Sequence, residues 1–319
     1  MRASCKNIAL MAVLGAIVPG FSASPSCAQA AAQTAPRTTP QTTPKAAPQA
    51  APKYRAPRTP DGRPNLGGIW QAINDADYDI QAHDARPGPL VVLGAWGGIP
   101  PSLGVVEGGP LPYRPEALAK KKENEANALA LDPVVKCFLP GVPRATYMGF
   151  PFQITQSAQY VAITYGYDFA SRAVKIGMKS QAPVDSWMGW SSGSWDGDTL
   201  VVDVTGQVED TWFDRAGDYH SDALHVTERY TATGPNSLLY EVTINDPKVY
   251  TRPWKMSMPL YRRLEKNIQL LDYNCVPFVE ELMYGHLRKV ETPGEKAKED
   301  STLPTAPSNA PTRNLDEEP

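Results

Sequence analysis

Three features of the sequence predict a mainly β protein: an antiparallel meander of about ten strands closed into a barrel, with one or two short helices. Apolar and polar residues alternate in nine short segments between residues 151 and 275. Turn signals separate these segments, the clearest being Asp196-Gly197, since both positions of a tight hairpin turn need positive φ. Helix patterns are confined to two stretches. A meander of this length avoids exposed edges by closing, and a two-sheet sandwich is the alternative.

The predicted strands follow one another in chain order with short connections. The first is GGIW at 67–70, near the start of the predicted domain. The other nine are PFQITQ (151–156), YVAITYGYD (160–168), SRAVKIGM (171–178), WMGWSSGSW (187–195), TLVVDV (199–204), ALHVTERYTA (223–232), SLLYEVTIND (237–246), PWKMSMPLYRRL (253–264) and NIQLLDYNC (267–275).

One hairpin register satisfies both faces of the strands around the turn at 234–236. Pairing Glu228 with Val242 places Arg229 opposite Glu241 on the other face, a favourable cross-strand pair of opposite charge. Glu228 is then the one ionisable group on the apolar face of this hairpin. The register therefore raises the question of why a carboxylate lies there.

Helix is predicted in two places. The segment PEALAKKKENEANALAL begins with Pro115, a suitable residue for a first helical position, and lacks strand-forming residues. The segment VPFVEELMYGHLRK at 276–289 predicts a helix after the last strand.

The two ends of the chain do not resemble a folded domain. Residues 1–30 have the basic start, short apolar run and small-residue cleavage site of a secretory signal peptide. Residues 31–60 are rich in Pro, Ala and Thr and predict a disordered tether, and residues 290–319 predict a disordered tail. A single β-barrel domain is expected at 61–289, and the protein is expected to be periplasmic or secreted.

Cysteine use agrees with export. Signal cleavage removes Cys5 and Cys27, which leaves Cys137 and Cys275. Two cysteines in an oxidising compartment are expected to form a disulfide, and two buried free thiols are the alternative.

Charge and hydropathy exclude some partners. The net charge is −3, and no basic stripe is present, so nucleic acid is not expected as a partner. No second long apolar segment follows the signal, so no integral membrane segment is expected after its removal. No cofactor is expected, since no Gly-rich phosphate loop links a strand to a helix. The sequence leaves the oligomeric state open.

Several motifs in order resemble an uncharacterised family of exported bacterial proteins. They are TPDGRPNLGGIW (59–70), DPVVKCFLPGVPR (132–144), MGWSSGSWDGDTLVVDV (188–204), TWFDRAGDYHSDALHVTERY (211–230) and DPKVYTRPW (246–254). The resemblance covers most of residues 59–275, and it implies export but no particular activity. The chain departs from the family in a longer Gly/Pro-rich stretch at 86–112. Gly-Ile-Trp at 68–70 is also similar to the first strand of lipocalin-like barrels.

Glu228 is the first candidate for chemistry, with His225 or Asp246 as a partner. Facing a cavity, a buried carboxylate with a raised pKa would suit proton transfer. The competing interpretation is a structural acid bonded to a buried tyrosine, arginine or backbone amide. If the opposite face of the strand points inward, His225, Arg229 and Glu241 become the candidates instead.

Weaker candidates lie on either side of this strand. His220, His225 and Asp214 have side chains that can bind zinc or iron, but turn and surface roles are commoner for such residues, so no metal site is predicted. Ser191 lies in a Gly-x-Ser-x-Gly pattern, but the helix that a nucleophile elbow needs does not follow it.

Aromatic residues are dense in the strand region and can line a pocket or fill a core. The ligand-binding candidates are Tyr230, Tyr240, Trp254, Trp190 and Arg229. The apolar, Gly-rich stretch at 88–112 is compatible with a lid over a site or with a plug on the barrel end.

Two functions follow from these features. The first is an exported small-molecule-handling β-barrel that binds a partly apolar or aromatic ligand in its interior. The alternative is an acid/base enzyme, a hydrolase, lyase or isomerase, that uses Glu228 in the barrel cavity. Both take a small molecule as ligand or substrate, and the sequence does not identify it.

Overall fold

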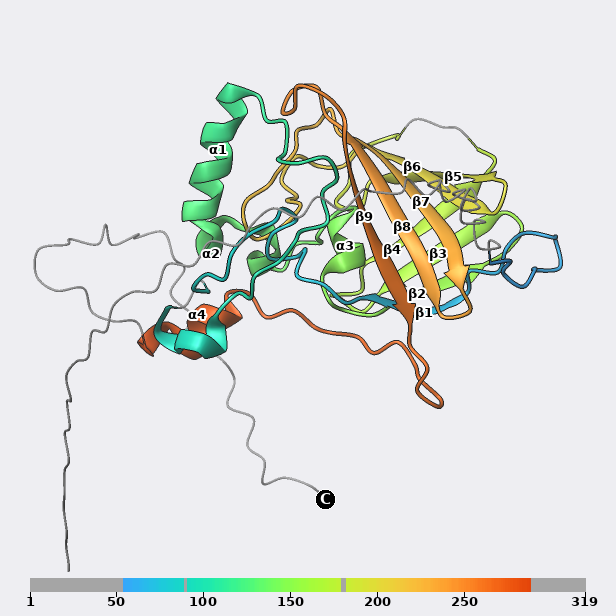
Figure 1. Ribbon diagram of the computed structural model, residues 1–319, viewed down its shortest axis with the longest axis horizontal. Helices are drawn as coiled ribbons and strands as arrows, with labels where there is room; N and C mark the ends of the chain where they lie inside the picture. The colour runs from blue at the N-terminus through green and yellow to red at the C-terminus, as the bar shows by residue number, and fades with distance from the viewer. Residues whose placement is uncertain (1–53, 89–90, 179–181, 288–319) are drawn as a thin grey trace, which may run out of the picture. The chain divides into compact units, whose positions relative to one another are not determined.

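The structure is a computed structural model (Figure 1), and it describes three ranges of the chain: 54–88, 91–178 and 182–287. The predicted signal peptide, most of the predicted tether and the predicted tail at 290–319 lie outside the described residues. The described part begins at Tyr54, shortly before the predicted start of the domain.

The nine strands form one closed barrel in sequence order, which confirms the predicted fold class and excludes the sandwich. Each strand is antiparallel to its neighbours except β4 and β5, which pair in parallel. β7, β8 and β9 are the longest strands and run side by side (Figure 1). The strands are β1 (Gly68–Ala72), β2 (Phe152–Gln156), β3 (Tyr160–Tyr165), β4 (Ser171–Ile176), β5 (Trp190–Asp196), β6 (Thr199–Thr205), β7 (His225–Gly234), β8 (Ser237–Asn245) and β9 (Trp254–Arg262).

The predicted strand at 267–275 is wrong. β9 already pairs with β1, so the closed sheet has no free edge for another strand. The segment makes only an isolated bridge between Tyr167 and Tyr273, and Leu271 is exposed. The alternation of apolar residues in this segment therefore does not reflect a half-buried strand.

Helical segments are short and lie outside the barrel wall. Pro115 is the first residue of α1, as predicted, and the predicted C-terminal helix is the single short α4 with a following 3₁₀ turn. No helix in the described part of the chain is long and apolar enough to cross a bilayer. The segments are η1 (Val91–Gly97), α1 (Pro115–Ala126), α2 (Ala128–Leu131), η2 (Pro133–Lys136), α3 (Arg144–Tyr147), α4 (Val279–Tyr284) and η3 (Gly285–Leu287).

The β7–β8 register is the predicted one. Glu228 lies opposite Val242, and Arg229 lies opposite Glu241. Side chains on β7 alternate between buried and half-buried positions from His225 to Tyr230. The strand therefore turns Glu228 into the barrel and His225 and Arg229 outward.

The β5–β6 hairpin differs in detail from the expectation. β5 ends at Asp196 and β6 begins at Thr199, so the two turn residues are Gly197 and Asp198. Only Gly197 has positive φ, at 58°. A glycine at the first turn position is sufficient here, because that geometry needs only one positive φ.

The seam between β1 and β9 is fixed by side chains as well as by the ladder. The Arg262 guanidinium lies 4.2 Å from the ring centroid of Trp70, and its Nη1 donates to the Gly67 carbonyl at 2.8 Å. A Cβ at Gly68, where φ is 145°, would lie 2.0 Å from Arg262 Nη1. Glycine is therefore required where the arginine crosses the first strand.

The predicted disulfide is confirmed. Cys137 and Cys275 are bonded with a Cα–Cα distance of 5.5 Å and lie 138 residues apart in sequence. Cys137 follows η2, and Cys275 precedes α4. The bond therefore ties the C-terminal segment after β9 to the helical turns that precede β2.

Breaking this disulfide should lower stability mainly by releasing chain entropy. For a loop of this length, the entropy model gives about 4–5 kcal/mol. We expect the Cys137→Ser/Cys275→Ser variant to unfold at a clearly lower urea concentration than the oxidised wild type. Reductant should shift the wild type to the same midpoint and leave the variant unchanged. Equal midpoints for wild type and variant would contradict a stabilising role.

Candidate functional site

A buried ion pair crosses the barrel interior between β4 and β7. Arg172 Nη1 lies 2.5 Å from Glu228 Oε2, and Arg172 Nη2 lies 2.8 Å from Oε1. The Glu228 side chain is completely buried, and that of Arg172 is 3% exposed. The geometry is a two-bond fork, the arrangement in which a guanidinium binds a carboxylate most strongly.

Tyrosines complete the coordination of the pair. Tyr230 and Tyr240 both donate their hydroxyls to Glu228 Oε1, at 2.9 and 2.6 Å. Tyr165 accepts a hydrogen bond from Arg172 Nε at 3.1 Å. Glu228 thus accepts four hydrogen bonds, which is the structural role that the sequence left open beside the catalytic one.

The buried partner keeps the Arg172 guanidinium charged. Burial alone would lower the pKa of Arg172, but the attraction of Glu228 outweighs it and raises that pKa well above its usual value. Burial and the neighbouring Glu228 charge raise the pKa of Tyr230 and of Tyr240 well above the ordinary phenol value. The phenols therefore remain hydrogen-bond donors to the carboxylate at any physiological pH.

The proposed catalytic partners of Glu228 lie elsewhere. His225 is on the outer face of β7, with its Nε2 3.3 Å from Asp203. Asp246 is buried beyond β8 and accepts from the backbone N–H and the hydroxyl of Ser221, at 2.6 and 2.9 Å. The structure therefore does not bring His225 and Asp246 to Glu228.

The ligand-binding candidates divide between the two faces of the sheet. Tyr230, Tyr240 and Trp254 are buried inside the barrel. Trp190 is half-buried on β5, with the Lys175 ammonium 5.6 Å from its ring centroid. Arg229 is on the outside and pairs with Asp196 at 2.8 Å.

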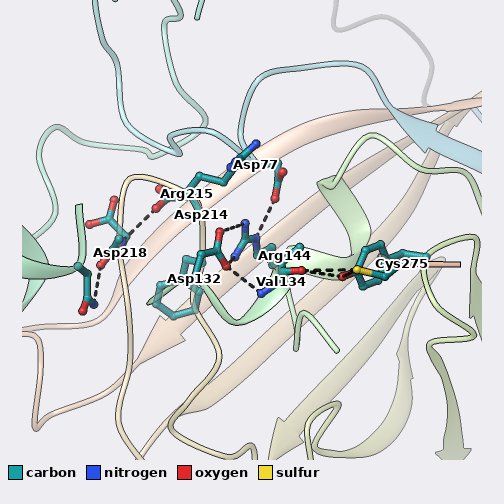
Figure 2. A network of polar contacts seen from close by, with 12 residues as sticks. Asp77, Asp132, Val134, Arg144, Asp214, Arg215, Asp218 and Cys275 are labelled. Atoms are coloured by element: carbon teal, nitrogen blue, oxygen red, sulfur yellow. Dashed lines mark hydrogen bonds and ion pairs between the residues drawn. The ribbon is translucent and has the colours of Figure 1, made fainter. Parts of the chain in front are cut away.

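A second polar network lies among the loops that flank the barrel, and Figure 2 shows it from close by. Arg144 on α3 binds Asp132 through both Nη atoms, at 2.8 and 2.9 Å, and binds Asp77 through Nε at 2.8 Å. The Arg144 and Asp132 side chains are each 1% exposed. This network fixes α3 and η2 relative to the segment that follows β1.

Three buried carboxylates meet next to this network. Oxygen atoms of Asp79, Asp214 and Asp218 all lie within 4.8 Å of one another. Burial and the neighbouring Asp218 and Asp79 raise the pKa of Asp214 well above its usual value, and burial also raises the pKa of Asp218. Such oxygen ligands are of the kind that hard divalent cations prefer. Asp214 is thus placed with other carboxylates.

The histidines proposed as metal ligands do not join this group. Thr211 Oγ1 lies 2.5 Å from His220 Nε2, and the Ser221 carbonyl accepts from His220 Nδ1 at 2.9 Å. Burial lowers the pKa of His220, so the ring is neutral near pH 7. Among the described residues, neither His220 nor His225 belongs to a cluster with metal-ligand geometry.

A cleft of about 220 Å³ opens beside the disulfide, and we call it the disulfide cleft. Its wall combines aromatic rings, aliphatic side chains and a few charged groups, as small-molecule sites do. The lining residues are Asp77, Asp132, Val134, Val135, Met148, Phe150, Tyr167, Arg215, Tyr273, Cys275, Val276, Val279 and Glu280. Four clefts on the described part of the chain do not include Glu228 in their walls: this one, one beside Tyr78, one in the 85–100 loop and one around Arg262.

Sequence reasoning missed most of these polar residues, although signals for them were present. Arg172 shares a face of β4 with Val174, so the strand alternation marks it as buried. Asp132 and Arg144 are the two charged ends of the motif DPVVKCFLPGVPR. Asp77 carried no comparable signal, because its role depends on contacts between distant segments.

Comparisons with known proteins add no assignment to this geometry: no protein-family model matches the chain, and a search of curated proteins finds no significant match.

Removing the charge of Glu228 should strongly destabilise the barrel, because Arg172 would keep a buried charge without its partner. We expect Glu228→Gln to lose about 3–5 kcal/mol of unfolding free energy. The matched control is Glu241→Gln on the outer face of β8, where we expect a loss of at most about 1 kcal/mol. Urea denaturation followed by tryptophan fluorescence measures both.

The double variant Arg172→Met/Glu228→Leu tests the cause of that loss. It removes both charges, so it should be more stable than Glu228→Gln alone. If Glu228→Gln is as stable as the control, the ion pair is not a structural element of the barrel.

The raised pKa of Asp214 predicts a pH dependence. A folded-state pKa above the unfolded value contributes stability that is fully present below the unfolded pKa, about 3.9, and is lost as pH rises through the folded-state pKa. Asp214→Asn cannot titrate at this position, so its melting temperature should fall less than that of the wild type between about pH 4 and pH 8. Asp210→Asn, at an exposed position, serves as the control and should follow the wild type. Parallel curves for wild type and Asp214→Asn would contradict the prediction.

Proposed function

We propose that the protein is an exported barrel that binds a small, partly aromatic molecule, and that the ligand occupies the disulfide cleft. The observation that carries the proposal is the cleft itself: about 220 Å³ lined by the rings of Phe150, Tyr167 and Tyr273 together with a few charged groups. A mostly apolar wall with a small number of convergent polar groups is typical of ligand sites.

The walls of this cleft are held by strong constraints. The disulfide fixes Cys275 on one side, and the Arg144 ion pairs fix Asp77 and Asp132 on another. The hydroxyl of Tyr167 donates to the Val134 carbonyl at 3.1 Å and so orients its ring. A site with fixed walls loses little conformational entropy on binding, which favours affinity.

Export is part of the same proposal. A disulfide is stable in an oxidising compartment, and this one supports the wall of the proposed site. The signal-like start of the sequence and the resemblance to exported bacterial proteins point to the same compartment.

The barrel interior beside Trp254 is the second candidate place for a ligand. Trp254 Nε1 is buried and has no hydrogen-bond partner among the described residues. A ligand with an acceptor oxygen would satisfy it. Acid/base catalysis at Glu228 receives less support, because Arg172 and two tyrosines already occupy its carboxylate.

Filling the disulfide cleft tests the proposal. Val276 lines the cleft and is 48% exposed, so Val276→Trp should block the site without disturbing the core. The matched control is Val184→Trp, at an exposed position outside the cleft. The probe is N-phenyl-1-naphthylamine, a neutral aromatic compound whose fluorescence rises on binding. We expect Val276→Trp to weaken its binding at least tenfold and Val184→Trp to leave it unchanged.

Equal binding by wild type and Val276→Trp would reject the cleft as the ligand site. In that case, loss of binding in Trp254→Phe, which removes the indole N–H, would assign the ligand to the barrel interior.

A further inference from the structure

The disulfide cleft has more negatively charged than positively charged groups in and directly behind its wall. Three carboxylates line it, those of Asp77, Asp132 and Glu280. They face two guanidinium groups, Arg215 in the wall and Arg144 behind it. One negative charge therefore remains after every nearby guanidinium has been paired.

The surplus charge belongs to Asp77. Asp132 is bound by both Nη atoms of Arg144, and Glu280 is bound by both Nη atoms of Arg215, at 2.8 and 2.9 Å. Asp77 offers only Oδ1 to Arg144, and no hydrogen bond to its Oδ2 is found among the described residues. Its side chain is 21% exposed, so a bound molecule can reach it.

The positive group in the wall is not free to oppose a cation. Arg215 is engaged by Glu280, and its guanidinium also lies 5.4 Å from the ring centroid of Tyr78. Burial would lower the pKa of Arg215, but the hydrogen bond and charge of Glu280, with Asp77 and Asp132, raise it. The local field at this edge of the cleft is therefore negative despite the arginine.

Aromatic rings form another part of the wall. The ring centroid of Phe150 lies 5.6 Å from that of Tyr167 and 4.8 Å from that of Tyr273. Tyr167 and Tyr273 stack at 6.0 Å. The faces of such rings attract cations, most strongly when the cation is weakly hydrated and organic. A hard metal ion, by contrast, needs six or more oxygen ligands. Two of the three carboxylates in this wall are already bound by arginines, so the wall does not supply that number.

We propose that the disulfide cleft selects a small organic cation, with an ammonium group at Asp77 and an aromatic or aliphatic body against Phe150, Tyr167 and Tyr273. The inference rests on the proposed function and specifies its ligand class. Charge selects the ammonium group, and the ring wall selects the apolar body, so the unmatched charge of Asp77 disfavours an anion of the same shape.

Three probes of similar shape and different charge test the class by isothermal titration calorimetry on the oxidised protein. They are phenethylammonium, 2-phenylethanol and phenylacetate. We expect phenethylammonium to bind at least tenfold more tightly than 2-phenylethanol and phenylacetate to bind more weakly than both.

Asp77→Asn identifies the group responsible. Asparagine keeps an oxygen acceptor for Arg144 Nε, so the wall should persist while the charge is lost. We expect at least a tenfold loss of affinity for phenethylammonium and no change for 2-phenylethanol, which also reports an intact cleft. Asp210→Asn, an equivalent change at an exposed site, should bind all three probes as the wild type does.

The outcomes separate this inference from the proposed function. Equal affinities for phenethylammonium and 2-phenylethanol, both lost in Val276→Trp, would overturn the cation preference and leave the cleft as the ligand site. Phenethylammonium binding that survives Val276→Trp would overturn both. A tenfold preference that Asp77→Asn leaves intact would overturn the assignment to Asp77.

Discussion

The ladder between β1 and β9, which runs from Trp70–Arg262 to Ala72–Leu260, leaves the nine-stranded sheet with no free edge. Closure divides every strand into an inner and an outer face, because side chains alternate along each strand. The side chains of Arg172 and Glu228 therefore point into the barrel, whereas that of Arg229 remains outside. Because the closed sheet has no free edge, the loops pack around the barrel and cannot add strands to it. The apolar segment after β9 forms no further strand for the same reason. The two candidate ligand sites, the barrel interior and the disulfide cleft, accordingly lie inside the barrel and among the flanking loops.

Burying the Arg172–Glu228 pair removes two full charges from water, which costs a large desolvation free energy. Well-aligned hydrogen bonds inside the barrel offset that cost. A two-bond fork and two phenol donors occupy the carboxylate, and Tyr165 occupies Arg172 Nε. A well-packed apolar pair could be equally stable, so the ion pair is better understood as fixing how β4 and β7 face each other. The same saturation explains why Glu228 is a weaker candidate for proton transfer than its isolated position in the sequence suggests.

Outside the barrel wall, polar groups are arranged differently. Arg144 pairs with two aspartates, the carboxylates of Asp79, Asp214 and Asp218 lie together, and a disulfide holds the C-terminal segment against η2. These constraints leave a cleft in which aromatic rings and one incompletely paired carboxylate, that of Asp77, lie together. Inside the barrel the charges of Arg172 and Glu228 are matched, whereas in the disulfide cleft one negative charge has no cationic partner of its own. That contrast is the physical reason to look for a ligand in the cleft rather than around Glu228.

Local features could be predicted from the sequence alone: nine of the ten strands, the β7–β8 register, the start of α1 at Pro115, and the pairing of the two remaining cysteines. Each depends on period-two alternation, turn chemistry or composition, which are properties of short segments or of counts. Other features required the three-dimensional fold. They are the parallel β4–β5 pair, the face of β7 that points inward, the partners of Glu228, the Asp79–Asp214–Asp218 cluster and the disulfide cleft. Each of these depends on contacts between segments far apart in the chain, such as those of Arg172 with Glu228 or of Asp77 with Arg144. No local pattern encodes such a meeting, because it depends on how the closed sheet and its loops pack in space.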